Sequence, residues 1–427
     1  EEYFGRGNVG ISHSTASLLF EGEEDSPGAR DAHFERSFIQ PATVATVDQL
    51  LMAGFNTGRW PLIEANAANG VIVIDEIHAY DPWTLALILQ SIEHFAHLGA
   101  RFMLMSATMP NYLLDLLESV LPGARVVRDT SLLDSSRNMF EVVDDEIEGV
   151  SDRIRNAASE ERKTLVVVNS VGKCQDLARK FSDLNPICYH SRFTLKDRME
   201  KERTIEEKER ADDQGALLIA TQVVEVSLDI NFDLLFTECA PPDAVVQRAG
   251  RVNRRRTKRD STVTICRASE GSRKIYEPDG TDLLARAFAA FAAGPKRPTE
   301  ADLTAIVEQV YAGVGIERDP RFLEASRAYS QSQRRLLGVY DNPILDTTYE
   351  VTRKVDYPQV PVIPLQFRDA VRDLPPIQRQ YYEVKMPLWY VRKHRDIRGD
   401  VVFCDMDYDA EFGARFSNRP EEVNLII

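Results

Sequence analysis

The stretch Val71-Ile-Val-Ile-Asp-Glu-Ile-His78 decides the fold. Four consecutive β-branched residues follow the turn pair Asn69-Gly70 and predict a short buried strand, because the run is too short for a helix. Two adjacent carboxylates end this strand. Asp81-Pro82 predicts the start of a helix, because aspartate caps a first turn and proline fits the first helical position. Arg101–Met105 is the next predicted strand, and the order strand, helix, strand indicates a parallel α/β unit.

The same alternation restarts further along the chain. Strands are predicted at residues 164–169, 187–190, 216–220, 234–236 and 262–266, with helices between them. Two such arrays predict two doubly wound lobes, joined near residues 125–160. The predicted domains are a partial first lobe (1–125), a second lobe (126–270), a helical and proline-rich linker (271–375) and a small accessory C-terminal domain (376–427).

Composition limits the range of functions. The 427 residues include 52 Lys and Arg against 67 Asp and Glu, for a formal net charge of −15. This balance argues against a protein that coats nucleic acid with a wholly basic surface, but it allows a local basic track. Five scattered cysteines without a C-x-x-C pair predict reduced, mostly buried thiols in a cytoplasmic protein. No apolar run approaches the ~20 residues that span a membrane, and no signal peptide is recognised.

Asp75 and Glu76 are candidates for the two carboxylates that ATP hydrolysis needs. One carboxylate holds Mg²⁺ and the other orients and deprotonates the attacking water, so we assign Asp75 to the metal and Glu76 to the water. His78 follows them directly, and Ser106 and Thr108 come one helix later, at the end of the next strand. Their hydroxyls can link a nucleotide site to a nucleic-acid site. Taken alone, a D-E pair is better explained as a solvated turn and S-A-T as a helix cap, but the apolar strand before Asp75 and the His78 that follows favour the catalytic interpretation of D-E.

Two polar stretches mark the second array. The first is Thr221-Gln-Val-Val-Glu-Val-Ser-Leu-Asp229, which leaves the strand at 216–220. The second is Gln247-Arg-Ala-Gly-Arg-Val-Asn-Arg254, in which Arg251 and Arg254 face the same way on a helix. Guanidinium groups make bidentate bonds to phosphoryl oxygens, so these two residues are candidate arginine fingers. The alternative is a basic surface helix, because residues 251–259 hold six basic residues and no acidic one; both interpretations remain open.

In this order the stretches resemble the motif series of superfamily 2 helicases of the DEAD/DEAH type: D-E-x-H, S-A-T and Q-x-x-G-R-x-x-R. The amino-acid sequences of five segments are similar to those of the CRISPR-associated helicase family of type I systems. These segments are A-T-V-D-Q-L (45–50), D-E-I-H-A-Y-D (75–81), H-S-R-F-T-x-x-D-R (190–198), A-T-Q-V-V-E-V-S-L-D (220–229) and Y-D-A-E-F-G (408–413). The resemblance is dense over roughly residues 1–270 and thinner at the C-terminus.

This resemblance implies two RecA-like lobes and an enzyme that uses ATP and Mg²⁺. It further implies 3′-to-5′ movement on single-stranded DNA after recruitment by a crRNA-guided surveillance complex that has opened an R-loop. An HD nuclease, in the same chain or in a partner, would degrade the unwound DNA. The alternatives are a catalytically incomplete helicase-like DNA-binding module and a generic superfamily 2 helicase.

The resemblance also implies roles for individual residues. The catalytic set is Asp75, Glu76, His78, Gln247, Arg251 and Arg254, with Asp75 as the metal ligand. The remaining nucleotide contacts are Ser106, Thr108, Asp229 and Gly250. The implied DNA path is lined by Thr46, Asp48, Gln49, Asn169, Ser170, His190, Ser191, Arg192, Thr221 and Gln222. Such side chains contact the nucleic-acid backbone, which suits a translocase that must not read bases.

Two parts of the family pattern are missing from this sequence. No G-x-x-x-x-G-K-[ST] loop is present, because Gly172-Lys173 lacks the first glycine and is followed by Cys174 instead of a hydroxyl. We expect that phosphate-binding loop upstream of Glu1. None of the seven histidines precedes an aspartate, so we expect an HD nuclease site elsewhere in the full protein or in a partner.

Overall fold

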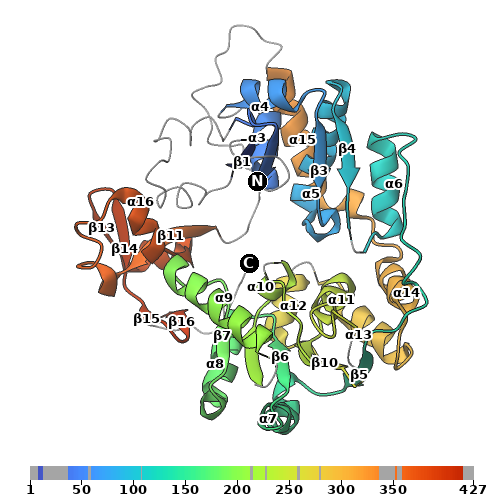
Figure 1. Cartoon of the computed structure of the whole chain (residues 1–427). Helices are drawn as coiled ribbons and strands as arrows, with labels where there is room; N and C mark the ends of the chain where they lie inside the picture. Colours follow the sequence, from blue (N-terminus) through green and yellow to red (C-terminus); the bar gives the residue numbers. More distant parts are fainter. Residues whose placement is uncertain are drawn as a thin grey trace. The chain divides into compact units, whose positions relative to one another are not determined.

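The computed structural model describes residues 8–12, 37–55, 59–106, 108–211, 215–226, 228–256, 260–277, 280–335, 352 and 358–416. The chain divides into two compact units (Figure 1). The first unit combines residues 1–127 with 313–356, and the second combines residues 128–312 with 357–427. Both contain parallel strands covered by helices, so the predicted α/β class is confirmed.

The strands of the first unit pair two by two. β1 (Val9–Ser12) pairs in parallel with β2 (Ala42–Ala45), and β3 (Val71–Ile74) pairs in parallel with β4 (Arg101–Leu104). The helices that follow them are α3 (Val47–Gly54), α4 (Trp60–Ala67), α5 (Pro82–His97) and α6 (Asn111–Val120). The start of α5 is the predicted one, because Asp81 accepts hydrogen bonds from the N–H groups of Trp83 and Thr84.

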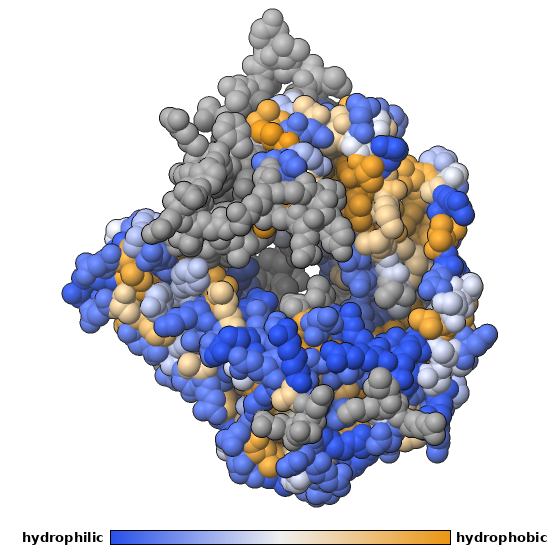
Figure 2. Space-filling model, viewed as in Figure 1, coloured by the Kyte–Doolittle hydropathy of each residue, from blue (hydrophilic) through white to orange (hydrophobic). Residues whose placement is uncertain are grey.

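One face of the β3–β4 sheet is exposed. Val71 and Val73 are 59% and 54% exposed, while Ile74 on the opposite face is buried in the core beside α5. The prediction of a buried strand is therefore wrong for one of its two faces, because successive side chains of a strand point to opposite sides of the sheet. Figure 2 shows apolar residues, in orange, gathered on this unit.

A helix from a distant part of the chain completes the first unit. After η4 (Ile316–Arg318), α15 (Pro320–Arg335) packs along α5, and its Ala325 and Tyr329 are buried in the same core cluster. Ser332 Oγ donates a hydrogen bond to Phe55 O at 2.9 Å. The segment predicted as a linker over 271–375 is thus divided between the two units instead of connecting two domains.

The second unit is built on a parallel six-stranded sheet with the order β5-β10-β9-β6-β8-β7. Its strands are β5 (Met139–Val143), β6 (Lys163–Val167), β7 (Ile187–Tyr189), β8 (Ala216–Ala220), β9 (Leu234–Glu238) and β10 (Thr262–Cys266). Its helices are η2 (Ile147–Val150), α7 (Ser151–Ser159), α8 (Val171–Lys180), η3 (Ser182–Leu184), α9 (Leu195–Arg210), α10 (Val223–Val226), α11 (Pro242–Ala249), α12 (Glu270–Tyr276), α13 (Leu283–Ala293) and α14 (Glu300–Tyr311). One hydrophobic cluster includes residues of α11, α13 and α14, and a second includes residues of α7 and α8.

The predicted junction near residues 125–160 contains structure of its own. β5 and α7 both lie in it, and β5 is an edge strand paired with β10. Only Phe140 of β5 is buried, so the apolar run that identifies a central strand is absent here. The second unit therefore begins earlier than its first predicted strand.

A small sheet near the C-terminus belongs to the second unit. Its strand order is β12-β11-β14-β13, and a hairpin of β15 and β16 follows. The elements are β11 (Gln359–Pro364), η7 (Leu365–Phe367), α16 (Pro376–Arg379), η8 (Gln380–Tyr382), β12 (Val384–Pro387), α17 (Leu388–His394), β13 (Arg395–Arg398), β14 (Val401–Cys404), β15 (Asp407–Asp409) and β16 (Gly413–Arg415).

The prediction of an extended linker over the proline-rich stretch is wrong where β11 forms. Pro361 and Pro364 both lie in this strand. β12 pairs with Gln359–Val362, whereas β14 pairs only with Ile363 and Pro364. At Pro361 the strand consequently has a partner on one side only, which is where a residue without an N–H is tolerated.

All five cysteines are buried and unpaired, as predicted. Among the described residues, no helix combines the length and the apolar character that crossing a membrane requires.

Candidate nucleotide and nucleic-acid site

The end of β3 carries Asp75 and Glu76 into a tight turn. Glu76 has a left-handed backbone with φ of 49°, and its N–H donates a hydrogen bond to Asp75 Oδ1 at 3.0 Å. A residue other than glycine holds this conformation only where its surroundings impose it, and such residues cluster at functional sites. The short helix η1 (Ile77–Ala79) follows, anchored by the fully buried Ile77. Two carboxylates are thereby held next to each other at the end of a parallel strand.

His78 joins this turn to the end of β4. Its Nδ1 lies 2.5 Å from Ser106 Oγ and 3.4 Å from Glu76 Oε2, and its side chain is buried. Ser106 Oγ also accepts a hydrogen bond from the N–H of Thr108 at 3.2 Å. The structure therefore brings D-E-I-H and S-A-T into direct contact, with His78 as the connecting side chain.

Removal of the Ser106 hydroxyl should weaken this connection measurably. We expect Ser106→Ala to lower the free energy of unfolding by about 1–3 kcal/mol, because a buried imidazole loses its hydroxyl partner. Urea denaturation measures this change. Ser119→Ala is the matched control: Ser119 is exposed on α6 and bonds only to the local Leu116 O, so we expect a change below about 0.5 kcal/mol. Equal effects for both variants would contradict a structural role for the His78–Ser106 contact.

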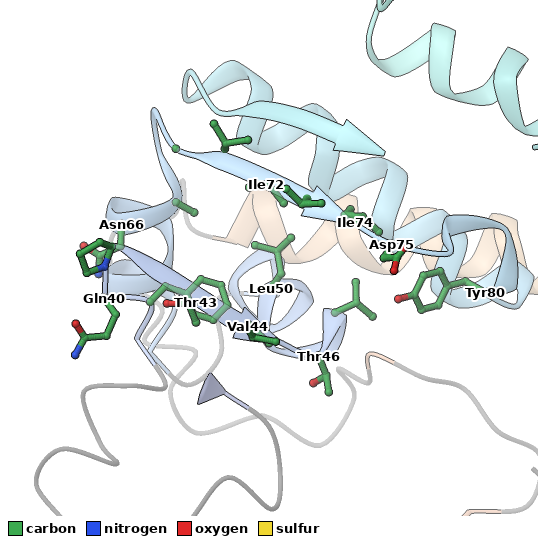
Figure 3. Close-up of a pocket in the computed structure, with 18 residues that line it drawn as sticks. Gln40, Thr43, Val44, Thr46, Leu50, Asn66, Ile72, Ile74, Asp75 and Tyr80 are labelled. Carbon is green, nitrogen blue, oxygen red and sulfur yellow. The ribbon is translucent and has the colours of Figure 1, made fainter. Parts of the chain in front are cut away.

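A cavity of about 610 Å³ lies beside the turn, between β2, α3 and β3 (Figure 3). Thr46, Asp75 and Tyr80 lie toward one end of it, and Gln40 and Asn66 lie toward the other. The side chains between the two ends are largely apolar. A candidate metal ligand and a candidate DNA contact thus border the same cavity.

Asp48 and Gln49, the other two candidate DNA contacts of this segment, interact within their own unit. Asp48 Oδ1 accepts a hydrogen bond from Thr352 Oγ1 at 2.8 Å, and Ser12 Oγ donates to Gln49 Oε1 at 3.5 Å. Both side chains are half-buried. A ligand that reaches them would have to share or replace these bonds.

In the second unit, the two candidate arginine fingers contact the 221–229 stretch. Arg251 donates hydrogen bonds to the carbonyl oxygens of Leu228, at 2.7 Å, and of Glu225. Arg254 forms an ion pair with Asp229 at 3.2 Å. The two polar stretches predicted for the second array are therefore joined inside one lobe.

Gln247 and Gly250 precede these arginines at the end of α11, which stops at Ala249, so the prediction that Arg251 and Arg254 share a helix face is wrong. Gln247 is half-buried, and Gly250 is the C-cap of the helix. A Cβ atom at Gly250 would lie 3.0 Å from Gln247 O, so the position has little room for a side chain. Close packing therefore favours glycine at this position, in addition to the nucleotide contact predicted for it.

Sequence reasoning missed Arg248, although it lies between the two assigned residues Gln247 and Arg251. Arg248 is fully buried and forms an ion pair with Glu225 at 2.7 Å. Burial raises the pKa of Glu225, and the adjacent guanidinium opposes that shift. The signal was present in the sequence: position 248 falls on the same helix face as the buried Ala244 and Val245, where a cation needs a carboxylate partner.

Three other predicted DNA contacts lie at strand ends but are buried. Asn169 is fully buried, and its Nδ2 donates to Cys239 O at 2.9 Å and to Ser272 Oγ at 3.0 Å. Ser170 caps α8, and Thr221 is 1% exposed. Gln222 is only half-buried, and its buried Oε1 has no hydrogen-bond partner among the described residues. Of the residues predicted to contact DNA in this lobe, Gln222 is thus the one with an unused acceptor.

Lys173, the lysine of the imperfect G-K pair, is committed to carboxylates. Its Nζ lies 3.0 Å from Glu146 Oε2, 3.0 Å from Glu148 Oε2 and 2.9 Å from the buried Glu238 Oε1. Burial alone would lower the pKa of Lys173, but Glu238 and the other two carboxylates raise it above its usual value. This lysine neutralises carboxylates of the protein. The contacts agree with the sequence, in which Gly172-Lys173 does not match a phosphate-binding loop.

His190 and Arg192 lie beneath the C-terminal hairpin instead of lining an open path. His190 Nε2 bonds to Phe412 O at 3.0 Å, and its Nδ1 accepts from the N–H of Arg192 at 3.1 Å. Arg192 is 4% exposed, its guanidinium lies 4.4 Å from the centre of the Phe416 ring, and burial lowers its pKa to about 10. Ser191 between them is half-buried. In this arrangement His190 and Arg192 are not accessible to DNA, because the hairpin covers them.

The Y-D-A-E-F-G segment supplies that cover. Tyr408 OH accepts a hydrogen bond from the N–H of Thr194 at 3.0 Å and donates to Asp197 Oδ2 at 2.5 Å. Asp409 Oδ1 accepts from the N–H groups of Glu411 and Phe412, which shapes the turn of the hairpin. Residues 408–413 and 190–194, two of the segments that resemble the helicase family, therefore pack directly against each other.

The donor set suits Mg²⁺ but supplies only part of a nucleotide site. Asp75 offers an exposed carboxylate, and Mg²⁺ is commonly bound by one or two carboxylates together with substrate phosphates. Among the described residues, no group of three or more His, Cys, Asp and Glu side chains could hold a metal by itself. The given sequence contains no G-x-x-x-x-G-K-[ST] motif.

Comparison with known proteins supports the predicted family resemblance. A family model for the C-terminal part of the CRISPR-associated nuclease/helicase Cas3 matches residues 160–257. A protein of Methanocaldococcus jannaschii described as a Cas3 nuclease/helicase is 33% identical over 278 residues, which cover 59% of this chain and 37% of that protein. The Cas3 nuclease/helicase of Methanothermobacter thermautotrophicus is 30% identical over 60% of this chain and 32% of its own length. The chain thus spans about a third of the length of these relatives.

Solved structures agree on the fold. The crystal structure of T. fusca Cas3-ATP covers 98% of this chain with a TM-score of 0.71 at 18% sequence identity, and the chain covers 60% of that protein. This likeness confirms the predicted fold, with RecA-like lobes. These matches support the resemblance to the Cas3 family of CRISPR-associated helicases that the motifs of the sequence predict.

Proposed function

We propose that this chain is the larger part of the ATP-driven motor of a type I CRISPR helicase. The observation that carries the proposal is the contact of Glu76, His78 and Ser106, where a turn of two carboxylates meets the S-A-T segment. The printed names of its relatives, nuclease/helicase, support the same activity, and so does the similarity of the fold to a T. fusca Cas3 structure that is named as an ATP complex.

The two carboxylates would divide the chemistry of hydrolysis. Bound ATP with Mg²⁺ supplies the anhydride and the metal that neutralises its phosphates. Asp75, exposed at the strand end, would hold the metal. Glu76 would orient the attacking water and accept its proton, while the buried His78 keeps the Glu76 side chain within 3.4 Å of its ring.

Arg251 and Arg254 would act on the transferred phosphate. Guanidinium groups offset the charge that develops on the phosphoryl oxygens in the transition state. Both arginines now contact oxygen atoms of their own lobe: Arg251 contacts two carbonyls and Arg254 contacts Asp229. Phosphoryl oxygens would replace these partners during a catalytic cycle.

The DNA substrate would be a single strand that passes Thr46 in the first unit and Gln222 in the second. We further propose 3′-to-5′ movement, recruitment to an R-loop by a crRNA-guided surveillance complex, and degradation by an HD nuclease in the same protein or a partner. The free cysteines fit such a role in the cytoplasm. One structural relative is described as a CRISPR RNA-guided surveillance complex before nicking, which supports the proposed partner.

ATP hydrolysis by the full-length protein tests the proposal. We expect single-stranded DNA to stimulate hydrolysis by at least about tenfold, and RNA of the same sequence to have little effect. A coupled-enzyme assay of ADP release measures both. Equal stimulation by RNA would favour a generic superfamily 2 helicase, and DNA binding without any hydrolysis would favour a helicase-like binding module.

A further inference from the structure

Arg248 uses every donor of its side chain inside the protein. The guanidinium has five N–H groups. Nε donates to Glu225 Oε1 at 2.7 Å, and NH1 donates to Thr237 Oγ1 at 2.9 Å and to Glu238 O at 3.1 Å. NH2 donates to Asn169 Oδ1 at 2.9 Å and to Tyr276 OH at 3.4 Å. No part of this side chain is exposed to solvent.

The five acceptors come from four separate elements of the second lobe. They lie just after β6, at the end of β9, in α10 and in α12, while Arg248 itself lies on α11 (Figure 1). A single side chain thus fixes the ends of two parallel strands relative to three helices. Open parallel sheets bind their ligands at these strand ends.

Glu225 is held twice, by α11 and by the turn that follows it. Arg248 on α11 binds its carboxylate, and Arg251, in the turn directly after this helix, binds its carbonyl oxygen. Thr221 and Gln222 lie directly before α10, which contains Glu225. Any displacement of the 221–225 segment is therefore transmitted to the position of Arg251 through one residue.

We propose that Arg248 and Glu225 are positioning residues that couple contact with single-stranded DNA to the placement of Arg251 at the phosphates. This inference rests on the proposed motor function. When a strand contacts Gln222, the rigid Arg248–Glu225 pair moves as one body with α10 and α11. Neither residue touches DNA or nucleotide itself; each acts through Gln222 and Arg251.

The alternative is that the pair only stabilises the lobe, and two conservative variants distinguish these roles. Arg248→Lys keeps the charge next to Glu225 but loses the planar fork that reaches Thr237, Glu238 and Asn169. Glu225→Gln keeps the size of the side chain and removes its charge. Ile154→Ala is the matched control for stability, because Ile154 is fully buried on α7 in the hydrophobic cluster that does not include α11.

The measurement compares ATP hydrolysis by the full-length protein with and without single-stranded DNA, alongside the unfolding temperature and the DNA dissociation constant. We expect Arg248→Lys and Glu225→Gln to leave DNA affinity and DNA-free hydrolysis within about threefold, while stimulation by DNA falls at least about tenfold. Ile154→Ala should lower the unfolding temperature and keep the stimulation.

Two results would overturn the inference in different ways. If DNA stimulates both variants as strongly as the Ile154→Ala protein at a similar loss of stability, the pair is purely structural, and the motor function stands. If the unmodified protein hydrolyses ATP at the same rate with and without DNA, the proposed function fails, and the coupling role fails with it.

Discussion

The variant Glu76→Gln is expected to reduce DNA-stimulated ATP hydrolysis by the full-length protein by about 10²- to 10⁴-fold, the range that loss of a general base produces. Glutamine preserves the size of the side chain and can hold a water molecule, but its amide does not accept a proton at neutral pH. The left-handed backbone at residue 76 is also preserved, because both residues have the same branching at Cβ. Nucleotide binding, measured by fluorescence titration, should therefore change little.

A second glutamate of the same unit provides the control. Glu93 is exposed on α5, and Glu93→Gln changes the net charge by the same amount without touching the turn. We expect this protein to hydrolyse ATP like the unmodified one. Hydrolysis by Glu76→Gln at the unmodified rate would remove Glu76 from the mechanism and would leave Asp75 as the carboxylate of this turn that hydrolysis requires.

The parallel strands could be predicted because each carries its own signal. β6, β8 and β9 are short apolar runs buried on both faces, which is the pattern of a central parallel strand. β5 has no such run, because an edge strand has a neighbour on one side only. Val71 and Val73 show the converse: an apolar sequence predicts burial, but burial also needs close packing, and both residues line the cavity between β2, α3 and β3, where they stay exposed.

Contacts within one motif could be predicted more easily than contacts between distant segments. The separation of one helix between D-E-I-H and S-A-T indicates neighbouring strand ends, and His78 and Ser106 indeed meet there. The cover over His190 and Arg192 comes from a hairpin more than two hundred residues away. No local periodicity encodes such a contact, so side chains expected on an open path are buried.

The contacts of Arg248 could be predicted in part. Its burial follows from its place on the apolar face of α11, which the sequence contains. Its partners Asn169, Glu225 and Tyr276 come together only when the sheet order is known. A charged residue on an apolar helix face therefore predicts a buried network, while the identity of its members requires the fold.

Gly413→Ala is expected to loosen the C-terminal hairpin from the second lobe. Gly413 has φ of 75°, and an added Cβ would lie 2.6 Å from Arg192 O and 2.7 Å from His190 Cε1. The left-handed backbone costs about 1–2 kcal/mol for alanine, and overpacking against a backbone oxygen adds about 1–3 kcal/mol. Hydrogen exchange should report the change at the Ala414 amide, which donates to Arg192 O at 2.8 Å.

Gly399→Ala separates the conformational part of this effect from the steric part. Gly399 also has a positive φ, 62°, but nothing lies within 4 Å of its Cβ position. It should therefore lose only the conformational part, about 1–2 kcal/mol. If both substitutions destabilise the protein equally, the close approach of Gly413 to Arg192 has no energetic weight.

The Gly413→Ala variant also tests whether His190 and Arg192 can contact DNA. Loosening of the hairpin in Gly413→Ala would expose a guanidinium that is now stacked on Phe416. If that group then contacts a phosphate of single-stranded DNA, the salt dependence of binding should steepen by about 0.7 in the slope of log K against log salt concentration. An unchanged slope, with hydrogen exchange showing the hairpin released, would assign both residues to packing alone and would leave Thr46 and Gln222 as the exposed or unpartnered members of the proposed path.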